Sequence, residues 1–172
     1  MIFNIGDPIN IIESATISGH PIVSTDNKFA ALCGGAFVIP MDLIMADGSK
    51  APTQQTVVVW DEIEEFLTDP SQMRALIFHE VGHIECGHFK ECKPSDLFEG
   101  VIKNVKYEIE ADEYSASKVG REAVIRMLET IQMRLPKHWV LKKYLNEEQI
   151  SAVVNELEAE MTPRIAALKK NQ

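Results

Sequence analysis

The feature that most constrains this chain is the segment from residue 71 to about residue 90, which is apolar on almost every side of a helix. Asp69 and Pro70 precede it and predict an N-cap followed by proline at the first helical position. A helix without a polar face belongs in a protein core. This helix nevertheless contains HEVGHIECGH, from His79 to His88, which holds three of the chain's five histidines. The segment is therefore either a buried metal site or a core helix with incidental histidines.

Two of these histidines have the spacing of metal ligands. His79 and His83 lie four residues apart, so on a helix both imidazoles project from one face, close enough to hold one Zn²⁺ at about 2.0–2.1 Å each. Glu80 follows His79 directly and can accept the proton that makes a water on such a metal nucleophilic. Gly82 allows another backbone to pack closely against the helix.

A catalytic zinc needs a third protein ligand and an open fourth position, and the stretch YEIEADEYSAS offers a candidate ligand. Glu108 lies on a second predicted helix, 25 residues after His83. Asp112 follows on the same face, where it can accept the free imidazole N–H of a ligating histidine. Two further acidic residues are expected on a solvated face of this helix: Glu110 and Glu113.

The rest of the chain places strands first and helices after. Short apolar runs punctuated by Gly, Pro, Asp and Asn predict strands and turns up to about residue 60. Further helices are expected in the ranges of about 96–119, 121–135 and 146–161. Asn146 and Gln149 resemble a capping box at the start of the last helix. The sequence therefore predicts an α+β fold in a single domain, residues 1–172, with a small N-terminal mixed sheet packed on the active-site helix and a helical C-terminal half.

Composition excludes several classes of function. The formal net charge of -9 argues against a nucleic-acid partner, because such binding depends on Lys and Arg. The three cysteines form no Cys-x-x-Cys pair and suggest no disulfide framework, so a reducing cytoplasm is expected. No run of about 18 uncharged apolar residues predicts a membrane span. We therefore expect a cytoplasmic protein with polypeptide or small-molecule partners, of an oligomeric state that the sequence does not give.

The motifs together resemble the gluzincin pattern of zinc peptidases. His79-Glu80-x-x-His83 followed by Glu108-x-x-x-Asp112 is most similar to the peptidases related to the CAAX prenyl protease and the HtpX-type heat-shock protease, including their soluble miniature relatives, the minigluzincins. The similarity extends to four neighbouring residues: Gly82, His88, Ala111 and Ala116. This resemblance implies a zincin-like fold, one Zn²⁺ per chain, a polypeptide substrate and endopeptidase activity with Glu80 as general base.

Two weaker similarities concern substrate binding. GGAFVIP is similar to an edge strand of the family whose backbone pairs with the substrate, although Gly35 stands where the family has Asn. The residues implied in this strand are Ala36, Phe37, Val38 and Ile39. His138 is similar to a downstream family histidine, which implies a role in stabilising the oxyanion.

Other interpretations stay open at this point. The same His-Glu-x-x-His motif occurs in small cytoplasmic proteases that cut phage repressors. A zinc-stabilised interaction protein without turnover is a second alternative, although a structural site has no use for a base such as Glu80. His88 is interpreted as a helix-end histidine, because three ligands are already supplied. By resemblance to the minigluzincins, an acidic residue of the helix at 146–161 could reach the zinc and keep the enzyme latent; the candidates are Glu156, Glu158 and Glu160.

Overall fold

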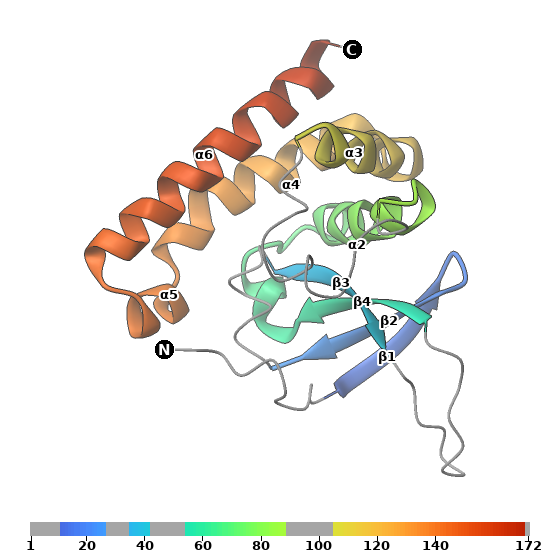
Figure 1. Cartoon of the computed structure of the whole chain (residues 1–172), viewed down its shortest axis with the longest axis horizontal. Coiled ribbons are helices and arrows are strands. Elements are labelled where there is room, and N and C mark those ends of the chain that lie inside the picture. The colour runs from blue at the N-terminus through green and yellow to red at the C-terminus, as the bar shows by residue number, and fades with distance from the viewer. Residues whose placement is uncertain (1–10, 27–34, 42–53, 89–104, 171–172) are drawn as a thin grey trace. The chain divides into compact units, whose positions relative to one another are not determined.

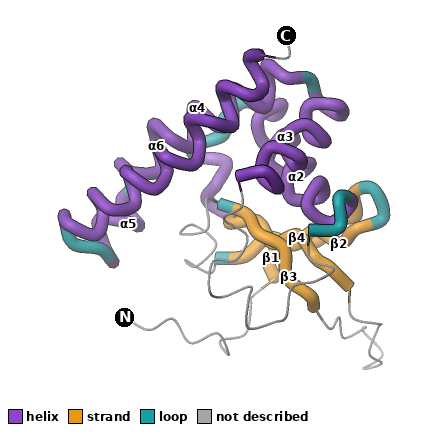
Figure 2. The backbone as a smooth tube through the Cα atoms, turned by 45° about the horizontal axis from the view of Figure 1, so that its top comes forward, coloured by secondary structure: helices purple, strands orange, loops and turns teal. Residues whose placement is uncertain are grey.

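The computed structural model describes residues 11–26, 35–41, 54–88 and 105–170, apart from a few of their side chains. The chain divides into two compact units, residues 1–63 and 64–172. The described strands lie in the first unit, and the described helices follow them in the chain (Figure 2). The α+β class is therefore confirmed, and the change from strands to helices falls close to the predicted residue 60.

The first unit contains a small mixed sheet. Its strands are β1 (Ile11–Ile17), β2 (His20–Thr25), β3 (Ala36–Met41) and β4 (Gln54–Trp60), in the order β1-β2-β4-β3. β1 and β2 form an antiparallel hairpin, β2 and β4 are parallel, and β3 runs antiparallel to β4. Within this order β3 is an edge strand, as the sequence predicts, whereas β4 is central and its Val57, Val58 and Trp60 are fully buried.

Gly35 precedes β3 in a conformation that requires glycine. Its φ of 101° lies in a region that L side chains rarely adopt, and a Cβ there would collide with the side chain of Ile63. Its carbonyl oxygen accepts a hydrogen bond of 2.8 Å from the backbone N–H of Trp60. An asparagine at this position would therefore be strained and would also displace Ile63.

The helices are η1 (Asp61–Glu65), α2 (Pro70–Glu85), α3 (Val105–Val119), α4 (Arg121–Arg134), η2 (Leu135–Lys137), α5 (Trp139–Tyr144) and α6 (Glu147–Lys170). In the second unit α2 packs against α3 and α4, and α6 runs along α4 and also contacts α3 (Figure 1). Val124, Met127 and Leu128 of α4 are at most 1% exposed. Burial of each such side chain contributes about 1.5–3 kcal/mol. None of the helices in the described ranges is long and apolar enough to cross a membrane.

The helix starts follow local rules, but two predicted ends are wrong. Helix α2 ends at Glu85 and not near residue 90. Asp69 caps α2 by accepting a 2.8 Å hydrogen bond from the N–H of Ser71. Asn146 and Gln149 bond reciprocally at the start of α6, which confirms the capping box. Residues 96–104 of the second predicted helix lie outside the described residues. The last helix does not end near residue 161 but continues past Pro163 to Lys170.

The continuation of α6 has a cause in packing. Proline inside a helix removes one backbone hydrogen bond and crowds the preceding turn. The turns after Pro163 nevertheless bury Arg164 and Leu168, which are 3% and 1% exposed. We infer that their tertiary contacts offset the cost of the proline and keep α6 helical.

Candidate metal centre

Helix α2 places both histidines of the motif in the interior. His79 and His83 are 5% and 3% exposed. Their Nε2 atoms lie 3.1 Å apart, so the one-turn spacing has turned both rings toward one point. Two such nitrogens approach this closely only if a proton or a metal ion lies between them.

A glycine lets the second helix approach α2. A Cβ at Gly82 would meet the backbone oxygen of Ala111 at 3.0 Å and the Ala111 Cα at 3.1 Å. The close crossing of α2 and α3 therefore needs a glycine here, as the sequence predicts. The Ser115 hydroxyl on α3 donates a 2.8 Å hydrogen bond to the Ala75 carbonyl on α2 and fixes the register of the pair. This crossing brings Glu108, one turn before Ala111, to the histidines.

The three predicted ligand residues converge on one point. Glu108 Oε2 lies 3.2 Å from His79 Nε2, and Glu108 Oε1 lies 3.4 Å from His83 Nε2. A tetrahedral ion with bonds of about 2.0–2.1 Å separates its ligand atoms by about 3.3 Å. The two nitrogens lie 3.1 Å apart, and each faces a different oxygen of the carboxylate at close to this separation. The residues present therefore fit a small divalent cation.

The composition of the group also indicates its chemistry. Among the described residues, this cluster offers a metal two imidazoles and one carboxylate, all buried: His79, His83 and Glu108. Structural zinc sites usually close all four positions with protein, whereas catalytic sites use three protein ligands. The cluster has the composition of the second kind.

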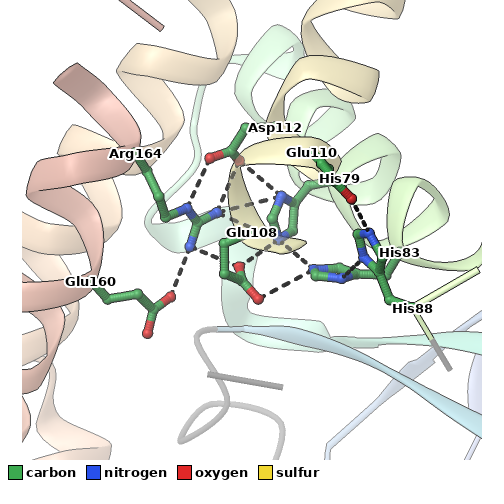
Figure 3. A network of polar contacts seen from close by, with 8 residues as sticks. All are labelled: His79, His83, His88, Glu108, Glu110, Asp112, Glu160 and Arg164. Carbon is green, nitrogen blue, oxygen red and sulfur yellow. Dashed lines mark hydrogen bonds and ion pairs between the residues drawn. The ribbon is translucent and has the colours of Figure 1, made fainter. Parts of the chain in front are cut away.

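An aspartate and an arginine support the first histidine. His79 Nδ1 lies 2.8 Å from an oxygen of Asp112, which is fully buried. Arg164 holds the same carboxylate through two bonds, from Nε at 2.8 Å and from Nη2 at 2.9 Å. Arg164 Nη1 also lies 3.1 Å from Glu108 Oε2 and 2.8 Å from Glu160 Oε1 (Figure 3). One guanidinium from α6 thus binds three carboxylates around the cluster.

These charges shift the pKa values of the group strongly. Burial alone would lower the pKa of His79, and Arg164 acts in the same direction, but Asp112 and Glu108 prevail and raise it to about 10. Burial opposes ionisation of Glu108, yet hydrogen bonds from the two histidines hold its pKa far below the usual range. Without a metal, the cluster therefore holds a proton at His79, where a metal would otherwise be bound.

Arg164 is the residue that the sequence analysis missed. It follows Pro163, at which a helix was expected to have ended, and no spacing connects it with a histidine 85 residues away. The one local signal is Glu160, four residues before it, with which it forms an ion pair. The hypothesis that Glu160 reaches the metal is not supported, because its carboxylate binds Arg164 instead.

The second histidine has a different support. His83 Nδ1 lies 2.9 Å from His88 Nδ1, and His88 Nε2 lies 3.0 Å from Glu110 Oε2 (Figure 3). His88 lies just after the end of α2, as expected, and its ring also contacts a histidine of the cluster. The side chain of Glu110 is 42% exposed, as expected for a solvated face, but its carboxylate is bound to the site through His88.

Glu80 is buried beside the cluster. It is 8% exposed, and burial raises its pKa to about 7. His79 acts against this shift, whereas the neighbouring Glu108 carboxylate adds to it. A carboxylate with a pKa near neutrality can both accept and return a proton, which is the behaviour that a general base requires.

The remaining predicted site residues are His138 and the strand from Ala36 to Ile39. The ring of His138 packs against Phe66, with centroids 4.5 Å apart, and its Nε2 lies 3.8 Å from Glu65 Oε2. A role for His138 at the oxyanion stays a prediction. Ala36 to Ile39 belong to β3 in the first unit, and their pairing with a substrate likewise stays a prediction.

Comparisons with protein-family models, with curated proteins and with solved structures give no match. The assignment of the centre therefore depends on its own geometry.

Proposed function

We propose that this protein is a zinc-dependent endopeptidase of the gluzincin type, with a zincin-like fold and one Zn²⁺ per chain. The observation that carries the proposal is the convergence of His79, His83 and Glu108: the two Nε2 atoms lie 3.1 Å apart, and each lies 3.2–3.4 Å from one oxygen of the carboxylate, distances that suit a tetrahedral ion. The adjacent buried Glu80 and the hydrogen bond from His79 to Asp112 support it. Carboxylate partners of ligating histidines are a general feature of zinc sites.

Each residue has a defined task in this proposal. His79, His83 and Glu108 would hold the ion, which supplies a Lewis acid that polarises a carbonyl and lowers the pKa of water to about 7. Glu80 accepts the proton of the attacking water and returns it to the leaving amine. Asp112 fixes the tautomer of His79, because it accepts the Nδ1 proton and leaves Nε2 facing Glu108 and His83.

A polypeptide substrate is the proposed partner. β3 forms an edge of the sheet in the first unit, and an extended peptide can add to such an edge as a further strand through backbone hydrogen bonds alone. This mode needs no particular side chain at Gly35.

The test combines metal analysis with digestion of an unfolded protein substrate. We expect about one zinc per chain and cleavage by the wild type. Glu80→Gln should keep the zinc and the fold but lose about 10²–10⁴-fold in the rate of cleavage, which is the scale of a positioned general base.

Two outcomes would contradict the proposal. An active Glu80→Gln variant would assign the activity to another site or to a contaminant. Zinc binding without cleavage of any substrate, including repressor-like folded proteins, would favour the alternative of a zinc-stabilised interaction protein.

A further inference from the structure

We propose that His88 and Glu110 form a relay that positions His83 as a metal ligand. Through this relay, a carboxylate on α3 sets the tautomer of a histidine on α2 through an intervening imidazole. The inference depends on the metal centre of the proposed function but not on peptidase activity.

The hydrogen-bond distances determine where the protons lie. A carboxylate only accepts, so the 3.0 Å contact with Glu110 places a proton on His88 Nε2. A neutral His88 then presents a lone pair at Nδ1. The 2.9 Å contact between the two Nδ1 atoms needs one proton, and this proton must belong to His83. His83 is thereby left with a lone pair at Nε2, the atom that faces His79 and Glu108.

His88 is held for this role by more than its hydrogen bonds. After the end of α2, Gly87 adopts a φ of 75°, and the His88 N–H donates back to the His83 carbonyl at 3.0 Å. This turn ends the helix, and the imidazole lies next to that of His83. The ring of Tyr107 stacks on His88 with centroids 4.4 Å apart and an angle of 13°. His88 is 7% exposed, so its orientation is fixed on several sides.

The relay also explains why Glu110 is not a passive surface residue. Glu110 Oε1 lies 3.7 Å from the exposed Lys106, and its other oxygen accepts from His88. The negative charge thus remains at the surface, where water solvates it, and only a hydrogen bond is transmitted to the buried ligand. A carboxylate placed directly at His83 would instead add a charge to the interior at a large desolvation cost.

The decisive experiment measures zinc affinity of the full chain by chelator competition, in a matched pair at residue 88. His88→Leu removes the acceptor, whereas His88→Gln keeps a carbonyl oxygen that can accept from His83. We expect an affinity about 10–100-fold weaker for His88→Leu, the scale of such supporting contacts, and partial rescue by His88→Gln. Glu110→Ala should also weaken zinc binding, and because the Glu110 side chain is 42% exposed, this variant should keep its fold. Glu113→Ala, on the same helix and paired with Arg121, is the control expected to leave affinity unchanged.

Nitrogen-15 NMR of the zinc-loaded protein gives a readout that a merely structural role would not affect. The expected spectrum has His83 bound through Nε2 with its proton on Nδ1, and His88 protonated on Nε2. The His83 Nδ1 proton should exchange quickly in His88→Leu, while the corresponding proton of His79 stays protected.

Each outcome decides the inference. Unchanged zinc affinity in both Glu110→Ala and a folded His88→Leu overturns the relay and leaves the metal centre intact. The opposite tautomer at His88 also overturns it. If His88→Leu does not fold, the zinc affinity of Glu110→Ala and the histidine tautomers of the wild type decide whether the relay exists. A wild type that binds no zinc overturns the relay together with the proposed function.

Discussion

The two histidines on α2 lie one turn apart and are held by opposite kinds of environment. His79 bonds directly to Asp112, which is fully buried and needs Arg164 as its counter-ion. His83 bonds to a second imidazole, and the carboxylate behind it is 42% exposed. We call the first set the charged arm and the second the neutral arm.

The difference shows how two histidines can be oriented at different cost to the fold. In the charged arm a buried ion pair must stay complete, because removing one partner leaves an uncompensated charge in the interior. In the neutral arm the charge is solvated. Removing one residue of this arm should therefore weaken the orientation of His83 without leaving an uncompensated charge in the interior. Damage to the charged arm should therefore affect the stability of the protein, and damage to the neutral arm mainly its affinity for metal.

The largest effect is expected from removing the cation of the charged arm. Arg164→Met keeps most of the side-chain volume but leaves Asp112 and Glu108 without their shared partner. We expect the free energy of unfolding of the metal-free protein to fall by about 3–5 kcal/mol. Urea denaturation in the presence of a chelator measures this free energy. Added zinc should restore part of the lost stability, because the ion supplies positive charge.

Lys169→Ala is the matched control for Arg164→Met. It removes an ion pair of α6 with Glu129 in which both side chains are about half exposed. Such a pair contributes about 0–1 kcal/mol. Equal losses in the two variants would contradict the charged arm as described.

A smaller effect is expected from Asp112→Asn. The amide oxygen can still accept the His79 Nδ1 proton, but the negative charge is lost. Zinc affinity should fall by about 10–100-fold, as measured by chelator competition. Unlike Glu110→Ala, this variant should also lower stability, because Arg164 loses its main partner. The comparison of the two arms fails if Glu110→Ala destabilises the metal-free protein as much as Asp112→Asn does.

The charged arm should also make metal binding depend on pH. The pKa of His79 rises from 6.5 to about 10 on folding of the metal-free protein. The folded state thus keeps a proton that the unfolded state releases near pH 6.5, so this contribution to stability is complete below that pH and is lost as pH rises toward 10. Zinc needs the same nitrogen deprotonated, so its affinity should increase with pH, by at most about tenfold per unit.

Calorimetry checks this dependence. Titrations with zinc in buffers of different ionisation enthalpy, between pH 7 and 9, should show release of about one proton per ion bound. The thermal stabilisation of the protein by zinc should grow over the same range. The groups that face His79 and enter this balance are Glu80, His83, Glu108, Asp112 and Arg164. Zinc affinity that is independent of pH would refute the raised pKa of His79.

The smallest effect is expected at the ion pair between Glu113 and Arg121. Their closest atoms lie 2.7 Å apart, but both side chains are about one-third exposed. Arg121→Ala should change the free energy of unfolding by about 0–1 kcal/mol and leave zinc affinity unaltered. A strong effect on zinc would show that charges outside the two arms also tune the centre.

The sequence by itself determined the features that depend on neighbouring residues. A helical repeat of 3.6 residues places His79 and His83 on one face, and Glu108 and Asp112 on another helix's face, whatever the rest of the fold. The caps at Asp69 and Asn146 follow from side chains that bond to backbone groups two or three residues away. Gly82 likewise predicted the close approach of a second backbone, although not which helix would supply it.

Only the tertiary structure decided what surrounds the two histidines. Arg164 reaches the centre because the packing of α6 carries the helix past a proline that local rules would treat as its end. His88 reaches His83 because a glycine turn ends α2 before His88, which changes the direction that helical periodicity assigns to its ring. In both contacts, burial and long-range packing stabilise the approach of the two groups. The spacing of neighbouring residues in the sequence does not reveal the energy of such packing.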